Sequence, residues 1–128
     1  IARALDAIAA GLANGPVLVH CAFGKDRAGP LSALVQAAVG VPAASIVADY
    51  GRSDGPTRAR RAWTLAEPLP DDPPTAHVPP MLFTAPSEAM QGLVEQLAEH
   101  HGSLSAWAAS FPIRPGTIER LRHALTEP

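Results

Sequence analysis

The chain has 128 residues, of which 47% are hydrophobic and 17% are charged, and its formal net charge is −2 at pH 7. This size suits one domain with a modest core, and the composition is ordinary for a soluble protein. The charge balance argues against a nucleic-acid-binding protein, and no apolar run approaches the length of a membrane span. A single cysteine excludes an intrachain disulfide framework.

The first third of the sequence predicts two helices separated by a strand and a loop. We expect a helix over residues 1–13, which Asn-Gly-Pro at residues 14–16 closes. Val17–Val19 is a short apolar run that indicates one buried strand, and Cys21–Asp26 is expected to form a loop. Helical spacing returns over Arg27–Val39.

The rest of the sequence predicts helices on either side of one proline-rich segment. A helix is expected from about Ala43 to Arg52, and the basic segment TRARRAW follows at residues 57–63. Glu67–Pro80 holds too many prolines for regular structure and is expected to be a loop or linker within the domain. Three further helices are expected near residues 86–101, 103–111 and 115–125.

Large apolar side chains in this C-terminal part recur at helical spacing, which predicts core packing rather than a ligand site. They are Leu93, Leu97, Leu104, Ile118, Leu121 and Leu125. Trp63 and Trp107 are expected to anchor a core or an interface. Ser103 is expected to cap a helix after a stop at Gly102.

The predicted strand is alone in this pattern, and a lone strand cannot satisfy its own backbone groups. We therefore expect its neighbours to come from a missing N-terminal segment or from a partner chain. The chain also starts with Ile1 inside a helical pattern, without an initiator methionine, which favours an N-terminally incomplete chain.

The segment between the predicted strand and the following helix has the geometry of an anion-binding loop. Backbone N–H groups of residues 22–27 can converge on one point, and the positive end of the helix favours a negative charge there. Cys21 at the base of this loop would have its thiolate stabilised. Arg27 supplies a planar guanidinium that can hold two oxygens of a phosphate. The loop therefore predicts a site for one oxyanion above one nucleophilic sulfur.

These residues carry a family resemblance. The sequence HCAFGKDRAG at residues 20–29 resembles the His-Cys-(five residues)-Arg signature of the cysteine-based protein tyrosine phosphatase superfamily. Its GKDR part is similar to bacterial tyrosine/serine and lipid phosphatases of dual or triple specificity. IVADYGRSD at residues 46–54 and the segment at residues 100–125 resemble later helices of that family. The resemblance covers nearly the whole chain, but only the C-terminal half of a full-length member.

The resemblance implies an α/β, protein-tyrosine-phosphatase-like fold. Residues 1–128 would be the C-terminal portion of a single phosphatase domain, with the Pro-rich loop 67–80 inside it. This portion would supply the strand that leads into the phosphate-binding loop and a mostly helical half of the domain.

The resemblance also implies a role for each residue of the loop. Cys21 would attack phosphorus and form a phosphocysteine, and Arg27 would hold the phosphate. Asp26 is a candidate general acid for the leaving alcohol, although the acid could instead lie upstream of Ile1. The phosphate-binding set would be Ala22, Phe23, Gly24, Lys25, Asp26 and Arg27. The resemblance implies no metal and no cofactor.

Neighbouring residues would support this site. His20 would order the loop and keep the thiol ionised, and Lys25 would add positive charge at its mouth. Two positions depart from the family. Family members usually carry Ser or Thr where this chain has Ala28, and their hydroxyl helps the sulfur to leave, so we expect slow hydrolysis of the phosphoenzyme. Phe23 stands where a small residue is common, so its ring would reshape the pocket wall or point into the protein.

Several polar residues have a structural interpretation beside the functional one. Asp26 is also a carboxylate that a helix N-terminus favours, and Asp49 and Tyr50 are expected to be structural more often than functional. The run formed by Arg58, Arg60 and Arg61 is either a solvated helix face or part of a lid that attracts acidic substrates. His100 and His101 suit a helix C-terminus, and no His-Glu spacing predicts a metal site.

The leading interpretation is a phosphomonoester hydrolase. Its substrate would be a phosphorylated protein, with phosphotyrosine first and phosphoserine or phosphothreonine second, or a phosphoinositide. One alternative is a catalytically impaired member that binds phosphorylated ligands without turnover. Another is a sulfurtransferase or an arsenate reductase, which the Cys-to-Arg spacing permits but the GKDR sequence disfavours.

Overall fold

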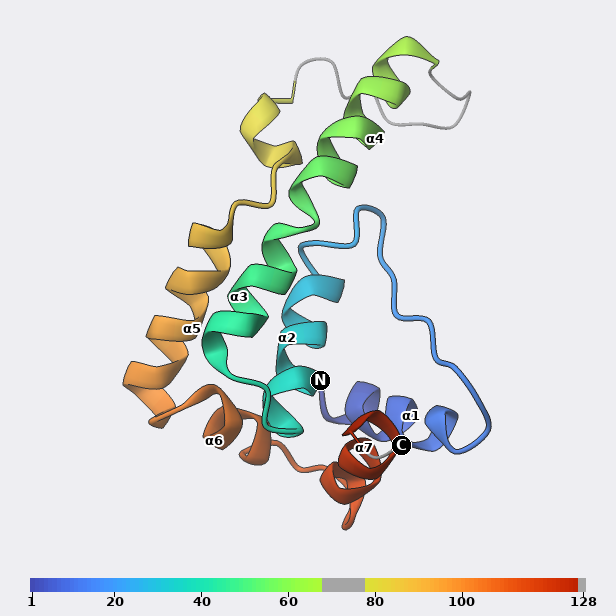
Figure 1. The fold of residues 1–128 in the computed structure, drawn as a ribbon, viewed down its shortest axis with the longest axis vertical. Coiled ribbons are helices and arrows are strands. Elements are labelled where there is room, and N and C mark those ends of the chain that lie inside the picture. The colour runs from blue at the N-terminus through green and yellow to red at the C-terminus, as the bar shows by residue number, and fades with distance from the viewer. Residues whose placement is uncertain (68–77, 127–128) are drawn as a thin grey trace.

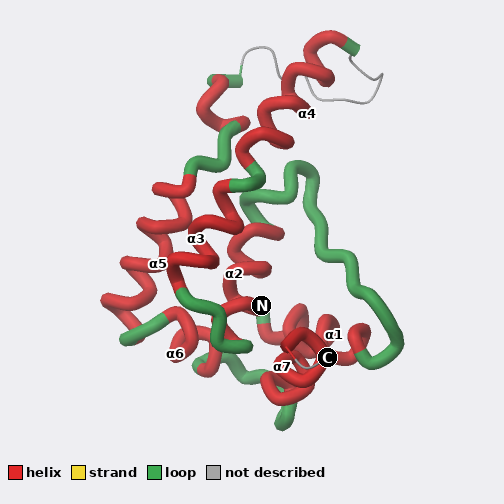
Figure 2. Tube along the Cα trace, in the orientation of Figure 1, coloured by secondary structure: helices red, strands yellow, loops and turns green. Residues whose placement is uncertain are grey.

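The computed structural model describes residues 1–67 and 78–126. These residues form helices joined by loops, and the described ranges contain no strand (Figure 2). The helices are α1 (Ala2–Leu12), α2 (Ala28–Ala38), α3 (Ala43–Gly51), α4 (Asp54–Ala66), the 3-10 helix η1 (Pro80–Phe83), α5 (Ser87–His101), α6 (Leu104–Ala109) and α7 (Thr117–Thr126) (Figure 1). In these ranges no helix is both long and apolar enough to cross a lipid bilayer.

The first three predicted helices are confirmed, with bounds that differ from the expected ones by a residue or two. Gly40, which follows α2, has a φ of 97°, a left-handed conformation that glycine adopts without steric cost. Pro42 then takes an extended conformation as the N-cap of α3. The local signals for ending and restarting a helix therefore work here as the sequence predicts.

Helix α4 incorporates the basic segment at residues 57–63. It begins at Asp54, whose carboxylate accepts hydrogen bonds from Arg58 Nε at 2.6 Å and from the backbone N–H of Ala85 at 2.7 Å. The second bond ties the start of α4 to the segment after η1. Residues 68–77 of the predicted proline-rich loop lie outside the described residues.

The C-terminal helices follow their predicted caps. The Ser103 hydroxyl accepts a hydrogen bond from the Ala106 N–H at 2.9 Å, and Gly102 ends α5 with a φ of 80°. The predicted N-cap and the predicted stop are both confirmed. At the next helix, Asp6 from α1 accepts a hydrogen bond from Thr117 Oγ1 at 2.6 Å, so the two ends of the chain are joined.

Two apolar clusters hold the helices together, and α2 contributes to both. One cluster joins α1, α2, α6 and α7 around Leu5, Leu34 and Leu121, which are fully buried. The other joins α2, α3, α5 and α6 around Ile46, which is also buried. Because α2 lies between these neighbours (Figure 1), its N-terminal end is held in a fixed position. That end is where the loop of residues 20–27 joins the helix.

The predicted core side chains are mostly confirmed, with one correction at Leu125. Leu104 and Leu121 are buried, and Leu93, Leu97 and Ile118 pack against the clusters. Leu125 is 47% exposed, because it lies in the last turn of α7, where no described helix covers it. Trp107 packs against both clusters, whereas Trp63 is 42% exposed on α4.

The described residues alone do not form the predicted strand at Val17–Val19. The segment is extended, but no backbone hydrogen bond within the described ranges involves it, and Leu18 is 84% exposed. A strand needs a paired neighbour, and the described residues supply none. The α/β fold class therefore stays an expectation, because the described structure is all-helical.

Candidate functional site

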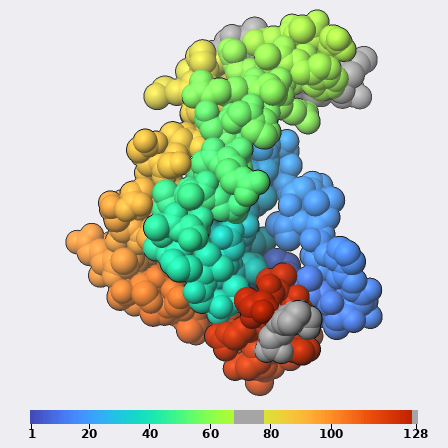
Figure 3. All heavy atoms as spheres, viewed as in Figure 1, coloured from blue at the N-terminus to red at the C-terminus, as the bar shows by residue number. Residues whose placement is uncertain are grey.

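The loop of residues 20–27 connects the extended segment to the first turn of α2. Space-filling atoms of the whole connection from α1 to α2 form a band along one edge of the molecule (Figure 3). Gly24 has a φ of 74°, which lets the chain reverse, and the Gly29 N–H then bonds to the Lys25 carbonyl at 3.1 Å. This turn directs successive backbone N–H groups toward the base of the loop.

Cys21 is the group at which these N–H groups converge. Four of them donate hydrogen bonds to its sulfur, from Ala28, Arg27, Phe23 and Gly24. They lower the pKa of the Cys21 thiol from 9.0 to about 7, and the Ala28 N–H has the largest effect, while partial burial acts in the opposite direction. The thiol is partly accessible. An accessible thiol with this pKa is a nucleophile near neutral pH.

Arg27 is the last residue before α2 and is exposed to solvent. No carboxylate in the described part of the chain pairs with its guanidinium. A guanidinium without a carboxylate partner keeps its planar donor set available for an incoming oxyanion. Cys21 and Arg27 are therefore on one short loop with the charge that an oxyanion site requires.

Lys25 differs from its expected place at the mouth of the loop. It is only 7% exposed, and its ammonium lies 3.1 Å from the Asp26 carboxylate, which is itself 70% exposed. Both residues line a cavity of about 170 Å³ that extends to Met90 on α5. The lysine charge is thus neutralised beside the loop instead of standing free at its entrance.

The remaining predicted site residues, His20, Ala22, Phe23 and Ala28, differ from one another in exposure and contacts. His20 and Ala22 are exposed, and Ala28 is 8% exposed with its N–H on the sulfur. The Phe23 ring meets the Phe83 ring of η1 edge-on at a centroid distance of 5.3 Å. This contact agrees with the expectation that the ring points into the protein.

The helix with the ADY sequence packs directly against the first turn of α2. The Tyr50 ring lies over Gly29, which has no side chain to obstruct it. Burial and, to a smaller extent, the Asp26 carboxylate raise the pKa of Tyr50. Asp49, beside it on α3, accepts a hydrogen bond from Gln36 at 2.9 Å. Both residues hold α3 to α2, in keeping with their expected structural role.

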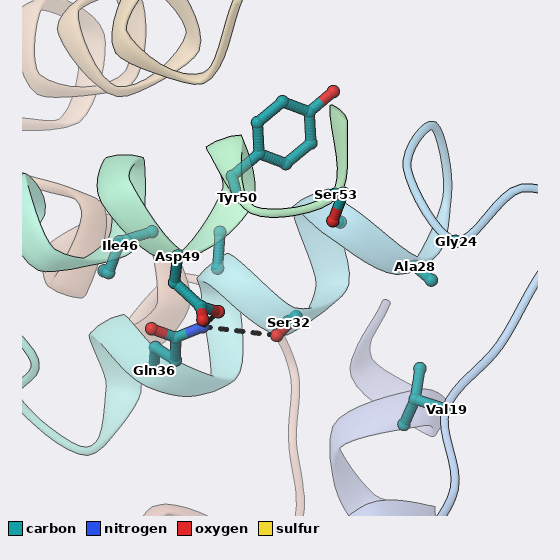
Figure 4. Close-up of a pocket in the computed structure, with 11 residues that line it drawn as sticks. Val19, Gly24, Ala28, Ser32, Gln36, Ile46, Asp49, Tyr50 and Ser53 are labelled. Carbon is teal, nitrogen blue, oxygen red and sulfur yellow. Dashed lines mark hydrogen bonds between the residues drawn. The ribbon is translucent and has the colours of Figure 1, made fainter. Parts of the chain in front are cut away.

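A cavity of about 190 Å³ lies between α2, α3 and the connection that leads to the loop (Figure 4). It reaches the loop at Gly24 and Ala28, and Gln36 and Asp49 lie side by side on its wall. Cys21 is not among the residues that line it. The cavity is therefore a neighbour of the sulfur site and not the oxyanion site itself.

The three arginines of the basic run have different partners. Arg58 pairs with Asp54, whereas the Arg60 and Arg61 guanidiniums lie over aromatic rings. No pattern in the sequence predicts these ring contacts, because they join segments far apart in the chain. In residues 1–67 and 78–126, no group of three or more His, Cys, Asp or Glu side chains could hold a metal ion.

Comparison with known proteins adds two findings. The model of the tyrosine phosphatase family matches residues 1–127. The chain is also 33% identical, over 135 aligned positions, to the triple specificity protein phosphatase PtpB of Mycobacterium tuberculosis. That alignment includes 96% of this chain and 49% of the relative, so the chain spans about half the length of the curated relative it matches.

Proposed function

The chain belongs to the tyrosine phosphatase family, and from this premise we propose that it hydrolyses phosphate monoesters through a phosphocysteine intermediate on Cys21. One observation carries the proposal. Four backbone N–H groups, from the loop and from the start of α2, converge on the Cys21 sulfur and lower its pKa to about 7. The same arrangement that stabilises a thiolate also suits the oxygens of a bound phosphate.

The proposed reaction has two steps. The Cys21 thiolate attacks phosphorus, the bond from phosphorus to the ester oxygen breaks, and the leaving oxygen takes a proton from a general acid. Water then attacks phosphorus, the sulfur–phosphorus bond breaks, and inorganic phosphate departs. Arg27 and the loop N–H groups hold the nonbridging oxygens, and these interactions strengthen as negative charge develops in each transition state.

The general acid remains a proposal with two candidates. Asp26 is exposed on the loop and lies 3.1 Å from the Lys25 ammonium. The second candidate is a carboxylate outside this chain. Replacement of Asp26 by Asn separates them, because loss of the acid slows the hydrolysis of alkyl phosphates much more than that of p-nitrophenyl phosphate, whose leaving group needs little protonation.

The proposed substrates are phosphorylated proteins, with phosphotyrosine first. Phosphoserine, phosphothreonine and phosphoinositides are proposed as further substrates, and the name of the relative, triple specificity protein phosphatase, supports a site that accepts more than one class of ester. The thiolate and the oxyanion site act on the phosphoryl group that all these esters share. Discrimination among them would come from the walls around the loop.

We further propose that strands from outside the described residues pair with Val17–Val19. Leu18 is 84% exposed, and the described structure gives this segment no backbone partner. Its two valines line an apolar cavity of about 230 Å³ with Leu12 and Val35. A paired sheet, supplied by further residues of the protein or by a partner chain, would cover these side chains and hold the entry to the loop.

The experiment is steady-state hydrolysis of p-nitrophenyl phosphate by the protein and by two variants. Cys21→Ser should reduce kcat by at least about 10³-fold, since serine is a poor nucleophile without an activating base. Arg58→Gln is the matched control, because it removes an arginine that is already paired with Asp54, and its kcat should be unchanged. Hydrolysis that persists in Cys21→Ser contradicts the proposal. Tight tungstate binding without any hydrolysis by the unmodified protein would instead support a catalytically impaired binder.

A further inference from the structure

We infer that Phe23 is a positioning residue, whose ring fastens the anion-binding loop to α4 and η1 and thereby keeps the loop in its anion-binding conformation. The inference rests on the proposed function of the loop. It adds that oxyanion binding by the loop depends on α4, a helix that contributes no group to the sulfur site.

The backbone of Phe23 is part of the loop, whereas its ring packs against side chains of η1 and α4. Its N–H is one of the four that bond to the Cys21 sulfur. Its half-buried ring meets Phe83 of η1 at 5.3 Å between centroids and 67° between planes, the edge-to-face geometry that aromatic pairs favour. Phe83 is only 5% exposed, so the ring of the loop residue packs against a fixed surface.

Arginines from α4 complete this layer. The Arg60 guanidinium carbon lies 5.7 Å from the centroid of the Phe23 ring and 5.9 Å from that of Trp63. The Arg61 guanidinium carbon lies 5.2 Å from the Phe83 ring centroid. Cations within about 6 Å of a ring centroid are attracted by its electron-rich face. We call these five side chains the aromatic–arginine layer.

The guanidiniums of Arg60 and Arg61 contact aromatic rings and not carboxylates. Across residues 1–67 and 78–126, no carboxylate pairs with Arg60 or Arg61, whereas Arg58 on the same helix bonds to Asp54 at 2.6 Å. The Arg61 Nε is buried and has no hydrogen-bond partner in the described part of the chain. The position of Arg60 is therefore set by aromatic faces, one of which belongs to the loop.

The Phe23 ring is an anchor on the side of the loop where the backbone has few other constraints. Gly24 has a left-handed φ and no atom within 4 Å of the place where a Cβ would stand. The segment before the loop makes no backbone hydrogen bonds within the described ranges. Phe23 is the only aromatic residue between Cys21 and Arg27. Loss of its ring would let the N–H groups diverge. The apparent affinity for an oxyanion would then fall, because only the fraction of molecules with the loop in its anion-binding conformation can bind.

The layer is itself fixed to the rest of the protein. The Asp54 carboxylate at the start of α4 bonds to the Ala85 N–H just after η1, at 2.7 Å. Because α4 and η1 are joined in this way, Phe83, Trp63 and the two arginines are carried by connected elements, against which the Phe23 ring packs. An oxyanion that orders the loop must then also order α4, since the coupling between two sites is reciprocal.

The test measures tungstate affinity, the KM and kcat for p-nitrophenyl phosphate, and hydrogen exchange of α4. Tungstate is used because it is a phosphate-like oxyanion that does not turn over. Phe23→Leu keeps an apolar side chain but removes the ring, and it should weaken tungstate binding and raise KM by about fivefold, with a smaller change in kcat. Phe23→Tyr keeps the ring and should restore most of the affinity.

Hydrogen exchange gives a readout that simple loss of stability would not produce. Saturating tungstate should slow the exchange of α4 amides in the unmodified protein, and this protection should disappear in Phe23→Leu and weaken in Arg60→Gln. The matched controls are Arg58→Gln on α4 and Phe111→Leu, since Phe111 forms a comparable ring pair with Trp107 at 5.2 Å and packs against the cluster that joins α1, α2, α6 and α7. Both controls should keep the tungstate affinity and the α4 protection.

Two outcomes would overturn the inference. One is unchanged tungstate affinity in folded Phe23→Leu, and the other is an α4 whose exchange does not respond to tungstate while the unmodified protein binds it. Failure of the proposed function is distinct from both, since the unmodified protein would then not hydrolyse the ester, whether or not it binds tungstate.

Discussion

Gly29 in the first turn of α2 and Tyr50 on α3 are in direct contact, and the contact leaves no room for a side chain at position 29. A Cβ built on Gly29 would lie 2.7 Å from Cε2 of the Tyr50 ring and 3.0 Å from Cδ2. The residue that follows the signature loop by two positions is thus a glycine because a neighbouring helix covers it. This contact sets how closely α3 approaches the end of the loop.

We expect Gly29→Ala to lower the free energy of unfolding by about 1–2 kcal/mol, because the added methyl group must displace the Tyr50 ring. The measurement is urea unfolding. The cost should shrink in a Tyr50→Leu background, since the obstructing ring is then absent.

The matched control for this prediction is Gly92→Ala in α5, where a Cβ would have no atom within 4 Å. That variant should be unchanged or more stable by up to about 1 kcal/mol, because alanine favours a helix over glycine. Equal effects at positions 29 and 92 would show that the Tyr50 contact does not limit the site.

The rate of Cys21 alkylation should depend on pH as expected for a thiol with a pKa of about 7. The hydrogen bonds from the loop favour the charged form, so the rate with iodoacetamide should rise through a midpoint near that pH, well below the ordinary value of 9.0. The hydrogen bonds to the Cys21 thiolate also stabilise the folded protein. This contribution is fully present above the pKa that the thiol has in the unfolded chain, and it is lost as the pH falls through the pKa of the folded state. Bound tungstate should suppress the reaction, whereas a midpoint near 9 would mean that the N–H groups do not converge on the sulfur.

Asp6 should stabilise the junction between α1 and α7 in a pH-dependent way. Its hydrogen bonds from Thr117 Oγ1 and then from the Arg114 N–H lower its pKa below 3.8. A carboxylate with a lowered pKa stabilises the fold above its unfolded-state pKa, and this effect is lost as the pH falls through the folded value. Asp6→Asn should therefore lower Tm by several degrees at neutral pH and by less in acid.

Thermal unfolding across this pH range checks the Asp6 prediction. Glu88→Gln is the control, because Glu88 is exposed in the first turn of α5, and its Tm should change little. A Tm difference for Asp6→Asn that does not narrow at acidic pH would exclude the carboxylate as the source of the effect.

Ala28 should make the release of phosphate from Cys21 the slow step. Its methyl group offers no hydroxyl to the departing sulfur, so rapid-quench kinetics with an aryl phosphate should show a burst. Ala28→Ser should raise the steady-state rate roughly fivefold and reduce the burst, as expected for about 1 kcal/mol from one hydrogen bond. Ala43→Ser, on the exposed first turn of α3, is the control and should keep the burst. A single linear phase in the unmodified protein would contradict this assignment.

Local signals in the sequence were sufficient for most helices. Gly102 and Ser103 specify a stop and a start through backbone conformation and one side-chain hydrogen bond, both of which act within a few residues. The loop was likewise identified from the spacing between Cys21 and Arg27. Such features are encoded by neighbouring residues, so they can be predicted without knowledge of the fold.

Other features depend on contacts between distant segments and were therefore missed. Val17–Val19 has the composition of a strand, but pairing depends on a neighbour that the described residues lack. The sequence predicts Lys25 at the loop mouth, yet the residue is buried beside α5 and forms an ion pair with Asp26. The ring of Phe23 meets Phe83, which is sixty residues further along the chain, and no local pattern indicates that pair.

The most direct test of the account is to look for the phosphocysteine. The protein is mixed with an aryl phosphate, quenched in acid and digested, and the peptide that contains residue 21 is examined by mass spectrometry. We predict one phosphoryl group on Cys21, present during turnover and absent from Cys21→Ser. Rapid hydrolysis with no phosphoryl group on that cysteine, or with the group on another residue, would contradict the proposed mechanism.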